Sequence, residues 1–123
     1  MINTLIIEDN QYMLNHLINM LQADETFNLV GAYKDAFEAE TVCAETQVDL
    51  VLMDVQTSHN HSGLAAGRRI KEANTGVKVV IVTSLIDPEV LSEAKSGAAD
   101  SLWYTDHGDS ELLDVILRTA DGG

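Results

Sequence analysis

The hydrophobic residues of this chain change their spacing in a regular way along its length. Three short apolar runs, rich in β-branched residues and without polar alternation, are Leu5–Ile7, Leu50–Met53 and Val79–Val82. Runs of this kind are typical of strands that are buried on both faces of a sheet. Two weaker strand candidates are Phe27–Ala32 and Asp100–Tyr104.

Between the predicted strands, apolar residues recur at the spacing of an amphipathic helix. The stripes are Leu14, Leu17, Ile18 and Leu21; Ala36, Ala39 and Cys43; Leu64, Gly67 and Ile70; Val90, Leu91 and Ala94; and Leu112, Ile116 and Ala120. Asp87 and Pro88 suit the start of the fourth helix, and Gly97 suits a left-handed cap at its end. Strands and helices that alternate in this way predict an α/β fold with helices on both faces of a parallel sheet.

The composition is that of one soluble globular domain. The chain has 123 residues, of which 46% are hydrophobic and 22% are charged. Its 7 Lys and Arg against 20 Asp and Glu give a formal net charge of −13, which opposes direct binding to nucleic acid or an anionic membrane. The chain has neither the roughly 18-residue apolar run of a membrane span nor the basic start of a signal peptide, so we expect a cytoplasmic protein.

Acidic residues stand where the predicted strands stop. Glu8 and Asp9 follow the first strand, Asp54 follows the third, and Thr83 ends the fourth. Ligands of open parallel sheets bind beyond the carboxyl ends of the strands, so we expect these residues to meet at one edge. Crowded carboxylates take up a proton or share a cation, and oxygen ligands favour Mg²⁺. Since an Asp can form an aspartyl phosphate, the pattern predicts Mg²⁺-assisted phosphoryl chemistry; the alternative is three solvated acids without a role.

Five segments, in this order and spacing, resemble the response-regulator receiver domain, the CheY-like phosphoacceptor module of two-component signalling. They are Leu5–Asp9, Val51–Val55, Ser62–Leu64, Val80–Ser84 and Gly97–Asp100. The resemblance covers essentially the whole chain. It implies a flavodoxin-like, doubly wound α/β fold with a five-stranded parallel sheet of order 2-1-3-4-5 and five helices.

The resemblance also implies roles for particular residues. Asp54 would accept a phosphoryl group from a sensor histidine kinase, and Thr83 would be the switch hydroxyl. Glu8, Asp9, Asp54 and the backbone carbonyl of Gln56 would hold Mg²⁺. The protein would be a signalling switch and not an enzyme, with at most Mg²⁺-dependent self-phosphorylation and self-dephosphorylation.

The C-terminal segment Val115–Gly122 resembles the helix that leads, in LuxR-type regulators, into a linker and a helix-turn-helix domain. This implies that residues 1–120 are the receiver domain and that 121–123 begin a linker. In a transcription regulator, a DNA-binding domain would follow outside this chain. The receiver domain would then control either the formation of a homodimer or the release of that DNA-binding domain.

Two residues of the last strand depart from the family pattern. Tyr104 stands where a Lys usually pairs with the phosphoryl group, and Ser101 stands where an aromatic residue is usual. Because a phenol cannot neutralise phosphoryl charge, we expect slower phosphorylation or weaker coupling to the switch surface. The alternative function is a phosphorylation-independent receiver that acts as a docking or dimerisation module. Trp103 is either part of a partner surface or an edge-strand anchor.

The loop between Asp54 and Gly63 is one residue longer than usual and contains His59 and His61. One interpretation is a transition-metal site, or imidazolium charge near Asp54 in place of the missing Lys. The interpretation we favour is two solvent-exposed loop histidines without a role, because two ligands do not make a specific metal site.

Overall fold

The computed structural model describes residues 1–73, 76–84, 87–105 and 108–121. Its elements run in the order β1 (Ile2–Ile7), α1 (Gln11–Gln22), β2 (Phe27–Tyr33), α2 (Ala36–Glu45), β3 (Leu50–Asp54), α3 (Gly63–Ala73), β4 (Lys78–Thr83), α4 (Pro88–Glu93), β5 (Ser101–Tyr104) and α5 (Asp109–Ala120). The strands form one parallel sheet of order β2-β1-β3-β4-β5, so the predicted fold class and strand order are confirmed. Most of the predicted linker, residues 122–123, lies outside the described residues.

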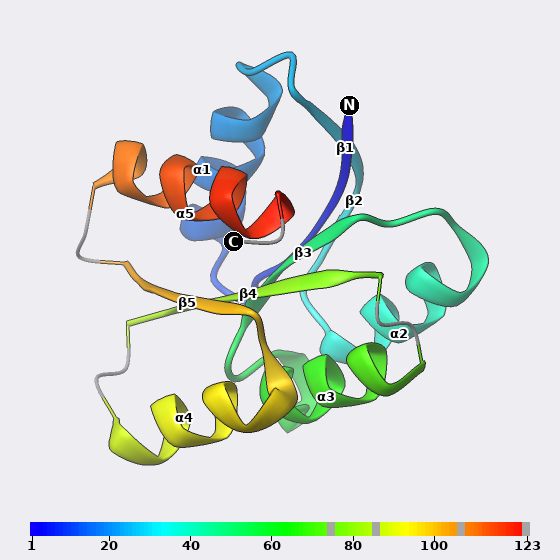
Figure 1. Ribbon diagram of the computed structural model, residues 1–123, viewed down its shortest axis with the longest axis vertical. Helices are drawn as coiled ribbons and strands as arrows, with labels where there is room; N and C mark the ends of the chain where they lie inside the picture. The colour runs from blue at the N-terminus through cyan, green and yellow to red at the C-terminus, as the bar shows by residue number, and fades with distance from the viewer. Residues whose placement is uncertain (74–75, 85–86, 106–107, 122–123) are drawn as a thin grey trace.

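Helices cover both faces of the sheet (Figure 1). The helices α1 and α5 lie on one face, and α2, α3 and α4 lie on the other. Successive side chains of a strand point to opposite faces, so Leu5 and Ile7 of β1 join the core under α2 and α3, whereas Ile6 joins the core under α1 and α5. Both faces are therefore buried, which explains why the apolar runs show no polar alternation.

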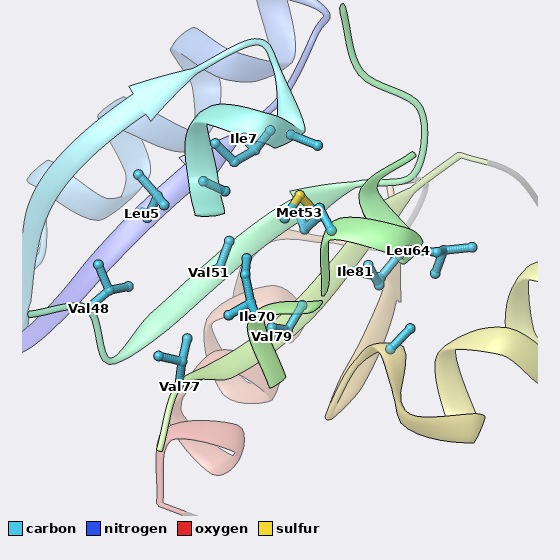
Figure 2. Packing of buried hydrophobic residues seen from close by; sticks show 14 of the residues in the cluster. Leu5, Ile7, Val48, Val51, Met53, Leu64, Ile70, Val77, Val79 and Ile81 are labelled. Atoms are coloured by element: carbon cyan, nitrogen blue, oxygen red, sulfur yellow. The ribbon is translucent and has the colours of Figure 1, made fainter. Parts of the chain in front are cut away.

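The larger core holds the central strands in place. Figure 2 shows Leu5, Val51 and Val79, from three neighbouring strands, on the side of the sheet where Ile70 of α3 packs. None of these side chains is more than 3% exposed. Burial of such a side chain contributes about 1.5–3 kcal/mol, so this core fixes the strand ends that carry the functional residues.

Local signals set the helix boundaries, with one difference from prediction. The Asp87 carboxylate accepts a hydrogen bond from the Glu89 N–H and caps α4, and Pro88 stands at the start of the helix, as predicted. The regular helix ends at Glu93, earlier than the apolar stripe predicts, because Ala94–Ala98 form a wider π-helical turn. Gly97 has φ +119° in this turn, a conformation that favours glycine.

The last strand begins one residue later than predicted. Asp100 lies before β5, where its carboxylate accepts hydrogen bonds from the backbone N–H of Val79 (2.8 Å) and the ammonium of Lys71 (3.0 Å). These contacts fasten the start of β5 to β4 and α3. No helix in the described parts of the chain has both the length and the apolar character that a bilayer span requires.

Candidate functional site

An open pocket of about 850 Å³ lies at the carboxyl ends of β1, β3 and β4. It brings together the predicted acids and hydroxyl, because parallel strands end at the same edge of the sheet. The predicted site residues among those that line it are Glu8, Asp9, Asp54, Gln56 and Thr83. The expectation that the three acids share one pocket therefore agrees with the geometry.

Gly63 fixes the position of Asp54. The first residue of α3 lies so close to the end of β3 that a Cβ at Gly63 would overlap the carbonyl oxygen of Asp54. The Gly63 N–H also donates a hydrogen bond to the carbonyl oxygen of Val55 (2.7 Å). Because only glycine permits this approach, the backbone that carries Asp54 has little freedom to move.

Glu8 and Asp54 share a hydrogen bond inside the pocket. The Glu8 side chain is buried, and its pKa is raised to about 8, first by burial and then by Asp54. Burial also raises the pKa of Asp54, but its hydrogen bonds with Glu8 and with the backbone N–H groups of Val55 and Asp9 oppose that rise. We therefore place the proton on Glu8, whose carboxyl O–H donates a hydrogen bond to the Asp54 carboxylate.

Asp9 lies at the exposed rim of the pocket. Its carboxylate accepts a hydrogen bond from the hydroxyl of Ser58 (2.7 Å), and the Ser58 N–H donates to the carbonyl oxygen of Lys34 (2.9 Å). The longer loop after β3 therefore contacts both the acidic pocket and the end of β2. Sequence reasoning missed Ser58, since nothing in the order of residues places it opposite Asp9.

The pocket has a donor set that fits Mg²⁺. Its carboxylates are Glu8, Asp9 and Asp54, and none of the described residues that line it is Lys or Arg. Two of the three acids are held together by a proton, which a hard divalent cation can replace. Oxygen ligands of this kind suit Mg²⁺, and Gln56, whose carbonyl was the fourth predicted ligand, lies in the same wall.

Thr83 places a hydroxyl group beside the acids. It is the last residue of β4, one position beyond Val82, which pairs with Asp54 in the sheet. Its side chain is 2% exposed, and its carbonyl oxygen accepts a hydrogen bond from the Thr105 N–H (2.9 Å). Thr83 is thus held in the pocket wall by its neighbours on both sides, β3 and the end of β5.

Ser101 and Tyr104 are not among the residues that line the acidic pocket. The Ser101 hydroxyl lies 2.6 Å from the hydroxyl of Thr119 on α5, which itself donates to the carbonyl oxygen of Val115 (2.7 Å). Tyr104 lines a smaller pocket of about 310 Å³ between β5 and α4, where Leu91 and other residues form the wall. The two positions that depart from the family pattern therefore lie on β5 and do not line the acidic pocket, although Tyr104 pairs in the sheet with Thr83, which does.

Trp103 is an edge-strand anchor. It is 5% exposed and belongs to the core that α1 and α5 cover, with Leu112 and Ile116 in the same cluster. A residue buried in this way offers no surface to a partner, so the alternative of a partner surface at Trp103 is wrong.

The two loop histidines contact a third acid. The Nδ1 atom of His59 lies 2.9 Å from Oδ2 of Asp35, and the Nδ1 atom of His61 lies 2.6 Å from Oδ1 of the same carboxylate. The hydrogen bond with His61 and the N–H of Phe37 are the main causes that lower the pKa of Asp35 to about 2. His59 is exposed, as expected, but the expectation is wrong for His61, whose side chain is 26% exposed.

Asp35 was not predicted as a site residue. It stands two residues after the end of β2. The expectation that ligand-binding residues follow the carboxyl ends of parallel strands, which led to Glu8 and Asp54, therefore also leads to Asp35 when it is applied to β2. Neither His59 nor His61 is among the described residues that line the acidic pocket, so their imidazoles do not stand in for a cation beside Asp54.

Comparison with known proteins identifies the family to which the chain belongs. The family model for the response regulator receiver domain matches residues 4–122. The chain belongs to this family. It is a receiver domain of a two-component response regulator, and receiver domains are signalling switches.

Individual relatives are distant in sequence and similar in structure. The receiver domain is 26% identical over 121 residues to the response regulator protein VraR of Staphylococcus epidermidis, covering 98% of this chain and 57% of VraR. It is 29% identical over 112 residues to the chemotaxis protein CheY of Halobacterium salinarum, covering 91% of each. A LuxR-family DNA-binding response regulator structure from Staphylococcus aureus superimposes with a TM-score of 0.90 at 18% identity, covering 98% of this chain and 99% of that one. The chain thus spans little more than half the length of VraR.

Proposed function

We propose that this receiver domain accepts a phosphoryl group on Asp54 from a sensor histidine kinase. The observation that carries the proposal is the meeting of Glu8, Asp9 and Asp54 with Thr83 in one open pocket at the carboxyl ends of the strands. A carboxylate at such a pocket can act as a nucleophile, and the hydrogen bonds that Asp54 makes with Glu8 and with the Val55 and Asp9 N–H groups oppose the rise in its pKa that burial causes.

The bonds that form and break in the transfer belong to the Asp54 carboxylate and to the phosphohistidine donor. A carboxylate oxygen of Asp54 attacks the phosphorus atom of a phosphohistidine, and an O–P bond forms as the N–P bond breaks. The electron pair of that bond leaves with the imidazole nitrogen of the kinase, which then takes up a proton. The position of Asp54 at the end of β3, held by the close contact with Gly63, orients the attacking oxygen.

Glu8, Asp9, Asp54 and the backbone carbonyl of Gln56 are the groups we propose as Mg²⁺ ligands. When bound, Mg²⁺ supplies positive charge that offsets the charge of the incoming phosphoryl group. Glu8 must release its proton to bind the ion, so we expect affinity for Mg²⁺ to fall as the pH is lowered.

Thr83 is the residue that we propose reads the phosphoryl group. Its hydroxyl would donate a hydrogen bond to a phosphoryl oxygen, and this contact would shift α4 and β5 toward their signalling arrangement. With Ser101 fastened to Thr119 and Tyr104 beside α4, the usual Lys and aromatic groups are replaced, so this coupling should be weaker than the family pattern implies.

The output we propose is control of transcription. The chain spans 57% of VraR, and the structural relative from Staphylococcus aureus is a DNA-binding response regulator. On this proposal, residues 1–120 are the receiver domain, 121–123 begin a linker, and a DNA-binding domain of a longer cytoplasmic protein is controlled through homodimer formation. A gene without a DNA-binding segment after the codon for Gly123 would contradict this part of the proposal.

Phosphoryl uptake tests the proposal directly. The protein is incubated with a small acyl phosphate donor, with Mg²⁺ or with EDTA, and its intact mass is measured. We expect a gain of one phosphoryl group with Mg²⁺ and none with EDTA. An unchanged mass with Mg²⁺ would contradict the proposal and favour a receiver that works without phosphorylation.

A further inference from the structure

Asp35, His59 and His61 form a cluster of side chains that could hold a metal ion. One ligand atom from each of these side chains lies within 4.8 Å of the other two. The cluster joins two segments that are distant in the sequence, since Asp35 caps α2 and the histidines belong to the longer loop after β3. It is separate from the acidic pocket, whose lining includes none of the three residues.

We propose that Asp35, His59 and His61 form a binding site for a divalent transition-metal ion, with Zn²⁺ the ion that best fits their chemistry. Two imidazole nitrogens and one carboxylate oxygen are ligands that Zn²⁺ takes in proteins, at about 2.0–2.2 Å, and three protein ligands leave a fourth position for water. Mg²⁺ prefers oxygen ligands, so the two neighbouring sites should select different ions.

The backbone of His59 supports a ligand role. His59 has φ +63° and ψ +26°, and it is the one non-glycine residue with positive φ in the described parts of the chain. A side chain in this left-handed conformation costs roughly 1–2 kcal/mol, which glycine would avoid. The conformation brings the imidazole to Asp35 while leaving the side chain 77% exposed, so an ion can enter from solvent.

Neighbouring residues hold the imidazole of His61 in place. The His61 ring stacks on the Phe37 ring with the centroids 3.5 Å apart and an angle of 10° between the planes. Arg69 lies over the Phe37 ring at 5.3 Å and pairs with Glu40 through two hydrogen bonds. Outer groups that orient metal ligands in this way are a regular part of metal sites.

The carboxylate of Asp35 can bind an ion without leaving its helix. Oδ1 accepts a hydrogen bond from the Phe37 N–H (2.9 Å) and caps α2, whereas Oδ2 faces His59. Coordination through Oδ2 leaves the cap in place, while each imidazole binds the ion through a ring nitrogen that carries no proton. The bound ion would then tie the loop after β3 to the start of α2.

Metal titration in excess Mg²⁺ tests the site, because on the proposed function Mg²⁺ would fill the acidic pocket and leave only the cluster free for Zn²⁺. Calorimetry follows Zn²⁺ binding, and the visible spectrum of Co²⁺ reports nitrogen and oxygen ligands in a tetrahedral site. We expect one ion per chain, and affinity lowered at least about tenfold in His59→Gly, His61→Gln and Asp35→Asn. The matched control is Glu25→Gln, since Glu25 is an exposed carboxylate that belongs neither to the cluster nor to the lining of the acidic pocket, and this variant should bind as the wild type does.

The variants separate loss of the site from loss of the fold. Asp35→Asn keeps a side chain that can cap α2, and His59→Gly removes the left-handed strain, so both should unfold with normal cooperativity. Zn²⁺ should raise the melting temperature of the wild type and of Glu25→Gln but not of His59→Gly. Equal Zn²⁺ affinity in the wild type and the three ligand variants, or no binding by the wild type, would overturn the proposal.

Discussion

Two carboxylates at the same edge of the sheet have opposite protonation behaviour. Glu8, after β1, has a pKa raised to about 8, whereas Asp35, after the neighbouring strand β2, has a pKa lowered to about 2. Glu8 is buried beside another acid, and Asp35 is hydrogen-bonded to two imidazoles and the Phe37 N–H. The strand ends bring acids to one edge, and the partners that loops supply decide which of them needs a cation.

The largest expected effect is a loss of stability at the acidic pocket. Gly63→Ala places a methyl group against the carbonyl oxygen of Asp54, and we expect it to lower the free energy of unfolding by about 3 kcal/mol. Gly108→Ala is the control, since a Cβ there meets nothing within 4 Å. Urea denaturation measures the free energy of unfolding of both variants. Equal stability of the two would mean that the end of β3 is not held rigidly.

A smaller loss is expected where the loop after β3 meets α2. The buried Thr57 hydroxyl accepts from the Ala36 N–H (2.9 Å) and donates to the carbonyl oxygen of His61 (2.8 Å). Thr57→Val keeps the shape but leaves these groups unpaired, which should lower the free energy of unfolding by about 2 kcal/mol in urea denaturation. The exposed Thr46→Val serves as the control. Unchanged stability of Thr57→Val would show that the loop is not fastened to α2.

Adding a cation beside the acids should speed phosphorylation. Tyr104→Lys restores the ammonium that the family pattern has at this position, and a charged hydrogen bond of about 1.5–3 kcal/mol implies at least a roughly tenfold faster uptake of phosphoryl groups. Tyr104→Phe is the control, because it keeps the ring without charge. Rates are followed by intact mass over time, and equal rates in Tyr104→Lys and the wild type would count against this role of the position.

The pH dependence of stability should distinguish the two carboxylates. The folded pKa of Glu8 is above its ordinary value of 4.5, so without metal the stability should fall as the pH rises from about 4.5 to about 8. The folded pKa of Asp35 is below its ordinary 3.8, so its contribution should be lost as the pH falls from about 3.8 to about 2. Melting temperatures in EDTA for the wild type and Glu8→Gln test the first trend, which should be weaker in the variant; equal trends would mean that Glu8 is not its source.

The apolar pattern was sufficient to predict the fold. Leu5–Ile7, Leu50–Met53 and Val79–Val82 all lie inside strands, because continuous burial on both faces leaves little choice of structure. The ends of elements were less predictable where side-chain contacts decide them. Asp100 fits a strand by its sequence, but its hydrogen bonds to Val79 and Lys71 place it before β5.

The candidate site was predictable where residues follow strands directly. Glu8, Asp54 and Thr83 meet because the topology requires it. The partnership of Asp35 with His61 was not predictable from spacing alone, since it depends on the path of the loop after β3. The left-handed backbone of His59 likewise follows from that path.

The central claim is that Asp54, and not its neighbour Asp35, is the phosphoacceptor. The most direct measurement is phosphoryl uptake from an acyl phosphate donor with Mg²⁺, by intact mass, in the wild type, Asp54→Asn and Asp35→Asn side by side. The account predicts one phosphoryl group on the wild type and on Asp35→Asn, and none on Asp54→Asn. Uptake by Asp54→Asn equal to that of the wild type would contradict it.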